Sequence, residues 1–263
     1  MSDPDYTPQE IMTIAAARRL TNGTVCFVGI GLPSAAANLA RLTHAPDVVL
    51  IYESGTIGAK PDVLPLSIGD GELAESADTV VSVPEIFRYW LQGGRVDVGF
   101  LGAAQIDRFG NINTTTIGGT YEKPKVRLPG AGGAPEIATA AKEVGIILKQ
   151  SKRSFVEKLD FVTSSGSYDD SVAAGKSLPQ GRGPTTVITD LGIMVSRREL
   201  RELILQWLHP GVTVNQVKEA TGWPLRVSLD LQETPAPNHQ ELVALRDLYA
   251  RTAAAHGAVS AGE

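Results

Sequence analysis

The sequence predicts an α/β fold: a mostly parallel open sheet with helices on both faces. Short apolar runs of four to six residues, typical of buried strands, alternate along the chain with segments in which apolar residues recur at helical spacing. Glycine-containing turns separate several of these segments. Strands and helices in alternation favour parallel pairing, because each helix returns the chain to the start of the next strand. We expect one domain over residues 1–263.

The elements follow from these patterns in order. Residues 8–20 carry apolar side chains at helical spacing, and Asn22-Gly23 ends that helix. Residues 25–28 form a short buried strand, which a turn connects to a helix at 35–43 with small residues suited to close packing. Residues 48–51 form the next strand. Further strands are expected at 79–83, 96–101, 144–148, 158–163, 185–189 and 193–195, and further helices at 85–92, 135–141, 214–221 and 240–255.

Two segments predict loop structure. Residues 164–184 are polar and rich in glycine and proline, so we expect a mobile surface loop, not a domain boundary, because strands resume after it. Residues 257–263 are small and polar, and we expect a frayed tail.

Composition excludes several classes of function. A net charge of −5 gives no electrostatic footprint for nucleic acid. The single cysteine, Cys26, lies in an apolar run and excludes an intrachain disulfide or a site of several thiolates. The four histidines lack metal-ligand spacing, so we expect no metal. No apolar run approaches the length of about 18 residues that spans a membrane, and no signal peptide is visible at the start. These features predict a cytoplasmic protein without a membrane partner.

Glu53 is the strongest candidate for chemistry. It directly follows the apolar run at 48–51 and precedes Ser54-Gly55, which places a carboxylate on a turn at the carboxyl end of a buried strand. Open α/β sheets bind their ligands at that edge. A glutamate that merely caps a turn or pairs with a cation is the alternative.

Two glycine clusters each follow a strand or open a helix. Gly29 and Gly31 resemble a dinucleotide-binding turn only loosely, since Ser34 replaces the third glycine and Pro33 removes an amide; a tight turn is the simpler interpretation. The loop at 130–133 leaves backbone amides bare at the start of a helix. Such a loop either holds a phosphate or an oxyanion, or is only a flexible turn.

Polar residues near these clusters have open roles. Gln105 and Asp107 follow a buried strand, and Asn111 and Asn113 either fix a turn or line a polar pocket. Three cations precede the second glycine loop and either meet acidic phosphates or are solvated surface charges: Lys123, Lys125 and Arg127.

Three motifs together resemble the beta subunits of class I coenzyme A transferases. They are Tyr52-Glu53-Ser54-Gly55, the stretch from Gly93-Gly94-Arg95 to Gly110-Asn111, and Gly130-Ala131-Gly132-Gly133-Ala134. They occur in the right order, and the resemblance covers about residues 8 to 256. It implies the sheet architecture of that family, with Glu53 as the nucleophile.

The resemblance also implies the rest of the site and the partners. Gly130 and Gly132, with Gly133, are expected to donate backbone hydrogen bonds near the thioester oxygen. Gly29, Gly31, Gly102, Ala103 and Gln105 are expected to line the substrate pocket. The implied substrates are an acyl-CoA and a dicarboxylic acid, without a further cofactor. The implied partner is an alpha subunit, in an α2β2 hetero-oligomer.

Two other functions compete with this interpretation. In a CoA-thioester hydrolase on the same fold, Glu53 would activate water. A non-catalytic small-molecule sensor on a similar sheet is the second, but no helix-turn-helix or basic segment is evident.

Overall fold

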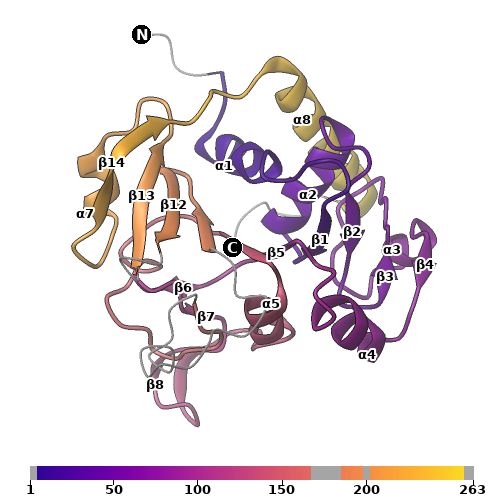
Figure 1. Ribbon diagram of the computed structural model, residues 1–263, viewed down its shortest axis with the longest axis horizontal. Coiled ribbons are helices and arrows are strands. Elements are labelled where there is room, and N and C mark those ends of the chain that lie inside the picture. Colours follow the sequence, from indigo (N-terminus) through magenta and orange to yellow (C-terminus); the bar gives the residue numbers. More distant parts are fainter. Residues whose placement is uncertain (1–4, 167–184, 198–201, 258–263) are drawn as a thin grey trace.

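The computed structural model describes residues 5–166, 185–197 and 202–257, which build one ten-stranded mixed sheet and two small two-stranded sheets (Figure 1). The order of strands in the large sheet is β14-β13-β12-β11-β10-β5-β1-β2-β3-β4. Its centre consists of five parallel strands. These are β1 (Val25–Val28), β2 (Val49–Ile51), β5 (Val98–Leu101), β10 (Glu143–Ile147) and β11 (Thr185–Ile188).

The antiparallel pairings lie outside the central strands, on both sides of the sheet. On one side, β3 (Thr56–Ile57) and β4 (Thr79–Val80) turn back beside β2. On the other side, β12 (Gly192–Arg197) and β13 (Glu202–Leu208) run antiparallel, and β14 (Arg226–Glu233) is parallel to β13. Five of the nine pairings are therefore parallel, and the prediction of a mostly parallel sheet is confirmed, with its parallel strands gathered at the centre.

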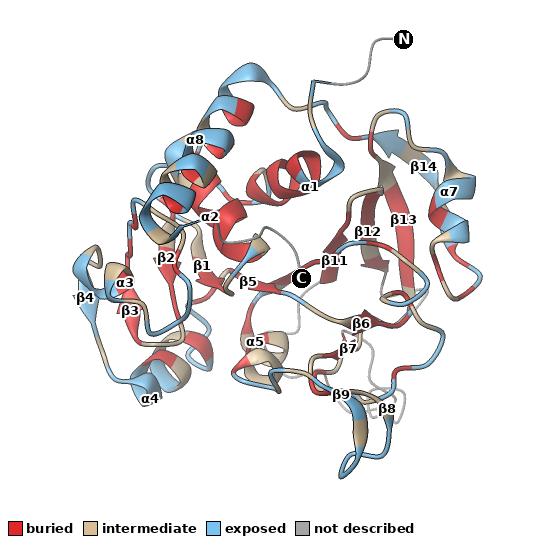
Figure 2. Ribbon diagram, turned by 180° about the vertical axis from the view of Figure 1, so that it is seen from behind, coloured by how far each residue is buried: buried red, intermediate tan, exposed pale blue. Residues whose placement is uncertain are grey.

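Helices cover both faces of the sheet, as predicted (Figure 2). One face carries α1 (Pro8–Ala17), α2 (Leu32–Leu42) and α8 (His239–His256). The other carries α5 (Ala134–Ala140), α7 (Val214–Glu219) and the short α4 (Val83–Glu85), which continues as the π-helix η1 (Ile86–Leu91). Successive residues of β1 point to opposite faces, so that Cys26 joins the first core and Phe27 the second. A further short helix, α3 (Gly71–Glu75), precedes β4.

The helix caps of α1 and α8 also join these two helices. Each begins with a capping box, formed by Thr7 with Glu10 in α1 and by Asn238 with Glu241 in α8. Each capping glutamate also accepts a hydrogen bond from an arginine of the other helix: Glu10 from Arg246 in α8, and Glu241 from Arg18 at the end of α1. Arg246 Nε lies 2.6 Å from Glu10 Oε1, and Arg18 Nε lies 2.7 Å from Glu241 Oε1.

Two glycines set the layer spacing around β5. A Cβ atom added at Gly145 of β10 would lie 2.5 Å from Cδ1 of Phe100, its neighbour in β5. A Cβ at Gly99 would lie 2.3 Å from Cγ2 of Ile137 in α5. Neither approach is possible for a larger residue without displacement, because interiors are close-packed. The absence of side chains at 99 and 145 therefore lets α5 and Phe100 pack directly against the strands.

Several predicted boundaries shift, and one prediction is wrong. The helix predicted at 35–43 begins at Leu32, because Pro33 is tolerated in its first turn. Residues 158–163 do not form a strand. The segment 151–166 instead lies along β6 (Gln105–Ile106) and β7 (Ile112–Asn113) and pairs with them only through single bridges at Phe155 and Ser164. Strands β3, β6, β7, β8 (Thr116–Gly119), β9 (Pro124–Arg127), β13 and β14 were not predicted.

The loop and tail predictions fall largely outside the described residues. Of the predicted loop at 164–184, only residues 164–166 are described, and of the tail at 257–263 only Gly257. In the described ranges, no helix combines the length and apolar character needed to cross a membrane. Cys26 is fully buried, as predicted, and burial raises the pKa of its thiol far above the ordinary value.

His209 holds the end of β13 inside the protein. It is 2% exposed, its Nε2 lies 2.8 Å from the carbonyl oxygen of Thr189, and its Nδ1 lies 3.0 Å from the hydroxyl of Thr234. Burial lowers the pKa of His209, because a charged imidazolium is poorly solvated there. The folded state therefore favours the neutral ring more strongly than the unfolded state does.

This burial predicts a pH dependence of stability. Below the unfolded-state pKa of about 6.5 the unfolded chain binds a proton that the folded His209 resists, so the free energy of unfolding falls as the pH decreases. Urea unfolding at about pH 8 and about pH 5.5 measures this loss. The His209→Gln variant should lose less stability over this interval than the wild type. The variant His239→Gln, which changes an exposed histidine, should match the wild-type pH dependence. An equal loss in the wild type and His209→Gln would contradict the assignment.

Candidate functional site

Glu53 lies at the tip of the tight turn that joins β2 to β3. The amide of Gly55 donates to the carbonyl oxygen of Tyr52 at 3.0 Å, and the amide of Tyr52 donates to Thr56 at 3.1 Å. Glu53 and Ser54 are the two central residues of this turn and are half-buried. The carboxylate therefore stands at the carboxyl end of a central parallel strand, where the sequence placed it.

Gly55 is required by this turn for steric reasons. Its φ is +105°, and a Cβ atom at this position would lie 2.0 Å from the carbonyl oxygen of Val81. The amide of Val81 donates to the carbonyl of Gly55 at 2.9 Å, which ties the turn to the chain after β4. Only glycine combines this φ with so close a backbone contact.

A buried polar network fixes the start of the turn to α2. The Tyr52 hydroxyl lies 3.2 Å from Ser34 Oγ and accepts a hydrogen bond from Asn38 Nδ2 at 3.3 Å. Arg41 continues the network by donating to Asn38 Oδ1. Burial raises the pKa of Tyr52, so its phenol stays neutral and keeps its proton for hydrogen bonding. The residue before Glu53 is thereby immobilised.

The second glycine loop meets Glu53 directly. A Cβ atom added at Gly132 would lie 3.7 Å from Glu53 Oε2 and 3.9 Å from Oε1, and one added at Gly133 would lie 3.3 Å from Glu53 Cδ. Two segments far apart in the sequence thus share one site. These contacts bring Glu53 and the glycine loop together, as the family resemblance implied.

The loop offers free backbone donors beside the carboxylate. Within the described parts of the chain, the amides of Ala131, Gly132 and Gly133 have no hydrogen-bond acceptor. Ala131 and Gly132 are exposed, and Gly133 is buried. Successive bare amides of this kind form an anion-binding nest.

Gly130 departs from its predicted role. Its amide donates to the carbonyl oxygen of Thr114 at 2.9 Å, and its carbonyl accepts from the Thr114 hydroxyl at 2.7 Å. In this conformation Gly130 is an anchor of the loop and has no free amide for an oxyanion. The prediction that Gly130 donates to the thioester oxygen is therefore at odds with its bonding, and the donors available are those of residues 131–133.

Phe87 is a site residue that the sequence did not reveal. It belongs to η1, is half-buried, and its ring centroid lies 5.9 Å from that of Phe27. A Cβ atom at Gly133 would lie 2.7 Å from Phe87 Cζ, so the ring and the Glu53 carboxylate both approach the same glycine. The ring forms an apolar wall of the site. An aromatic residue in a helical pattern is typical of core packing, so no sequence signal distinguished it.

The other predicted pocket residues lie at the same edge of the sheet or beyond it. Gly29 and Gly31 follow β1, and Gly102 and Ala103 follow β5; both strands are parallel to β2 and close to it in the sheet order. A Cβ atom at Gly31 or Gly102 would meet nothing within 4 Å, so the surface there is open. Their contact with substrate stays a prediction.

Gln105 is buried and committed to internal hydrogen bonds. Its Oε1 accepts from Asn113 Nδ2 at 2.8 Å, and its Nε2 donates to Asp160 Oδ2 at 2.7 Å. Asn111 Nδ2 donates to Asp107 at 2.9 Å and fixes the turn after β6. Asn111 and Asn113 were expected either to fix a turn or to line a polar pocket. Their described contacts are those of residues that fix a turn.

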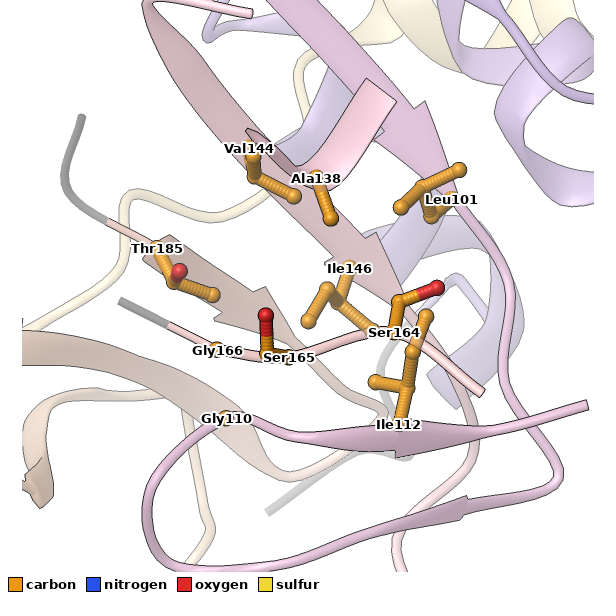
Figure 3. A pocket seen from close by; sticks show the side chains of 10 residues that line it. All are labelled: Leu101, Gly110, Ile112, Ala138, Val144, Ile146, Ser164, Ser165, Gly166 and Thr185. Carbon is orange, nitrogen blue, oxygen red and sulfur yellow. The ribbon is translucent and has the colours of Figure 1, made fainter. Parts of the chain in front are cut away.

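Two hollows elsewhere do not include Glu53. A cavity of about 10 Å³ lies between β5, β10, α5 and residues 164–166 (Figure 3). Its wall combines apolar side chains, such as Leu101 and Ile146, with polar groups, and the buried hydroxyl of Ser164 has no described partner. This volume suits a single water molecule at most. A groove of about 200 Å³ beside α1 and α8 is lined by Arg18, Thr43, His44, Asn238, Gln240 and Glu241.

Metal ligation has no candidate in the described part of the chain, where no three His, Cys, Asp or Glu side chains are grouped. The chemistry available is therefore that of a carboxylate beside backbone amides and an aromatic wall. Residues 9–220 match the protein family described as "Coenzyme A transferase".

The chain belongs to the coenzyme A transferase family. It is 68% identical over 252 residues to the beta subunit of the 3-oxoadipate CoA-transferase of Pseudomonas knackmussii, covering 96% of each chain. The crystal structure of glutaconate coenzyme A-transferase from Acidaminococcus fermentans is similar, with a TM-score of 0.83 and 32% identity over 92% of this chain and 94% of that one. The decarboxylase AibA/AibB is also similar, with a TM-score of 0.79 and 28% identity over 93% and 95%.

These findings confirm the resemblance to beta subunits of coenzyme A transferases and the fold class that it implied. One of the similar structures, AibA/AibB, is named a decarboxylase. Membership of the fold therefore does not by itself fix the reaction, and the site residues must be tested individually.

We predict that Gly132→Val lowers turnover strongly without unfolding the chain. A branched side chain beside the Glu53 carboxylate would obstruct an approaching acyl group and displace the loop amides; loss of one oxyanion donor typically costs about 10²–10³ in rate. Steady-state kinetics and circular dichroism measure the two effects. Gly211→Val is the matched control, because Gly211 also has a positive φ but no atom within 4 Å of an added Cβ. Near-normal turnover of Gly132→Val would reduce the loop to a simple turn.

Proposed function

We propose that this chain is the catalytic beta subunit of a CoA-transferase in which Glu53 carries CoA as a glutamyl thioester. The observation that supports it most strongly is the Glu53 carboxylate lying against Gly132 and Gly133, next to free backbone amides. A nucleophile beside oxyanion donors is the arrangement that acyl transfer needs. The 68% identical relative carries the name of such an enzyme.

The reaction needs no proton transfer or further cofactor. A carboxylate oxygen of Glu53 attacks the acyl-CoA carbonyl carbon, the carbon–sulfur bond breaks, and CoA leaves as thiolate from an acyl-glutamyl anhydride. The thiolate then attacks the Glu53 carbonyl carbon and releases the first acid as its carboxylate. The second acid attacks the glutamyl-CoA thioester, and the same two steps in reverse deliver its CoA ester. This sequence gives ping-pong kinetics.

Each attack places negative charge on a former carbonyl oxygen. The amides of residues 131–133 are suited to stabilise that charge, because they belong to the loop that contacts Glu53 and donate to nothing else in the described chain. Anchoring of Gly130 to Thr114 keeps the loop in position without using these donors.

Hydrolysis competes with transfer at the same site. Water would destroy both the anhydride and the thioester, so a transferase must exclude it. The ring of Phe87, which approaches the same glycine as Glu53, helps to exclude water. In this proposal Glu53 attacks the thioester itself and does not activate a water molecule. We therefore favour transfer over hydrolysis as the main activity.

Replacing Glu53 tests the covalent mechanism. Glu53→Ala should lose several orders of magnitude in turnover, because no other group in the site can form the acyl anhydride. Mass spectrometry after incubation with acyl-CoA and borohydride should find the modification of the wild-type peptide at Glu53. Glu157→Ala, which removes an exposed carboxylate, is the control and should keep full activity. Substantial transfer by Glu53→Ala would refute the mechanism.

The chain requires an alpha subunit in this proposal. Exposed apolar residues lie on elements near Glu53 and the amide loop: Val80 at 55%, Val83 at 47% and Tyr89 at 57%. A partner covering this side would complete the pocket and exclude water. Stable obligate interfaces bury on the order of 2,000 Å² or more. We propose an α2β2 assembly.

We expect the purified chain to show negligible transferase activity alone and to gain it on addition of the alpha subunit. Light scattering coupled to size-exclusion chromatography should report a hetero-oligomer in the same samples. Full activity of the isolated chain would contradict the requirement for a partner.

The proposed acids are 3-oxoadipate and succinate, exchanged as CoA esters. The support is the identity of 68% to a relative named for 3-oxoadipate, compared with 35% to a glutaconate enzyme subunit. Specificity constants for a panel of acids, with succinyl-CoA as the donor, should be highest for 3-oxoadipate. If glutaconate or acetoacetate exceeds it tenfold, about 1.4 kcal/mol of transition-state preference, the assignment of the acid fails while the transferase chemistry stands.

A further inference from the structure

The β8–β9 hairpin extends away from the main sheet and leads straight into the catalytic loop (Figure 2). Its strands pair antiparallel from Thr116↔Arg127 to Gly119↔Pro124. After β9, the amides of Leu128 and Gly130 bond back to the chain after β7. The hairpin and the amide loop are therefore held together as one unit.

The hairpin carries an uncompensated positive charge in a chain whose net charge is −5. Lys123, Lys125 and Arg127 are all exposed, and none of them forms an ion pair within the ranges that the structure describes. Glu122 is the one carboxylate in the hairpin. By contrast, many other cations of the chain, such as Arg18, Lys60 and Lys142, are paired.

Packing holds two of these cations on one face. Lys125 and Arg127 alternate along β9 and therefore project to the same side. The stem of Lys125 lies over Gly118, where an added Cβ would come within 2.9 Å of Lys125 Cδ. The guanidinium of Arg127 lies 4.9 Å from the ring centroid of Tyr121 and donates to its carbonyl oxygen.

An exposed aromatic surface accompanies the charges. Tyr121 is 56% exposed and stacks on Phe161, with ring centroids 5.7 Å apart and planes inclined by 29°. Phe161 supports the ring from the segment that lies along β6 and β7. The ring is held between Phe161 and the Arg127 guanidinium, which fixes the position of this cation. Fixed cations of this kind are suited to the phosphates of a nucleotide.

We propose that the β8–β9 hairpin binds the 3′-phosphorylated ADP end of coenzyme A. This inference rests on the proposed CoA-transferase function. Lys123, Lys125 and Arg127 contact the phosphates, and Tyr121 holds Arg127 in place. Arg127 precedes Gly132 by five residues, a reach of at most about 18 Å in a fully extended chain. The long pantetheine arm of CoA separates its sulfur from its phosphates, which lets the thioester reach Glu53 while the nucleotide stays on the hairpin.

The nucleotide fits this charge better than the carboxylic acid does. The distal carboxylate of a dicarboxylic acid carries one charge and lies only a few bonds from the reacting carbon. The hairpin presents three cations in a row outside the amide loop, which matches several phosphate charges at a distance from the chemistry. Phosphate groups prefer such clusters of arginine and lysine.

The test compares a full with a truncated thioester. The double variant Lys123→Gln/Lys125→Gln retains the Arg127–Tyr121 contact and removes two charges. In the assembled enzyme, we expect its KM for succinyl-CoA to rise on the order of tenfold, with kcat for succinyl-pantetheine and its KM unchanged. Adenosine 3′,5′-bisphosphate should inhibit the wild type competitively against succinyl-CoA and should inhibit the double variant more weakly. Because exposed charges are screened by salt, the wild-type KM for succinyl-CoA should also rise more steeply with ionic strength.

Lys149→Gln/Lys152→Gln is the matched control, since it removes two exposed lysines after β10 and should leave both thioesters unaffected. Equal changes for succinyl-CoA and succinyl-pantetheine, or no change for either, would overturn the inference. Failure of the double variant to assemble with the alpha subunit would also overturn it and assign the hairpin to the subunit interface. If the wild type transfers no CoA at all, the proposed function itself fails, which is a separate outcome.

Discussion

The contact between Gly99 and Ile137 sets the position of the glycine loop that lies against Glu53. Because Gly99 has no side chain, α5 packs directly on β5, and residues 131–133 immediately precede that helix. The next residue of β5, Phe100, points to the opposite face and fills the space left by Gly145. A larger residue at 99 would lift α5 and with it the preceding loop, which lies against Glu53 at Gly132 and Gly133. The geometry of the site therefore depends on the spacing between a helix and a strand in the core.

The two sides of the site are built differently. The turn bearing Glu53 is held by backbone hydrogen bonds, by the close contact of Gly55 with Val81 and by the buried phenol of Tyr52. The facing loop is anchored at Gly130, while its following amides are left without acceptors in the described chain. In water the exposed amides of Ala131 and Gly132 are solvated at little cost, so they are free to exchange water for a developing negative charge. A fixed carboxylate thus lies against a loop whose amides have no acceptor in the described chain.

Local patterns predicted the central strands and Glu53, because both depend on neighbours in the sequence. The meeting of Glu53 with Gly132 and Gly133 depends on strand order in the sheet, which no local pattern contains; the family resemblance supplied it. The strand predicted at 158–163 is wrong although polar and apolar residues alternate there. Asp160 is instead held by hydrogen bonds with the side chain of Gln105. The β13 strand was missed because it pairs antiparallel with β12, outside the strand–helix alternation on which the prediction relied. The β14 strand does follow a helix and lies parallel to β13, but it was missed because it is mostly exposed and contains no continuous apolar run.

The burial of Cys26 protects its thiol from reaction with other thiols. It is the single thiol of the chain, fully enclosed in the core shared with α2, and burial strongly disfavours its thiolate. Disulfide exchange requires an accessible thiolate. A protein handling free coenzyme A meets a thiol at every turnover, and an exposed cysteine would form mixed disulfides with it under oxidative stress. With its sulfur out of reach, this subunit avoids S-thiolation by its own substrate.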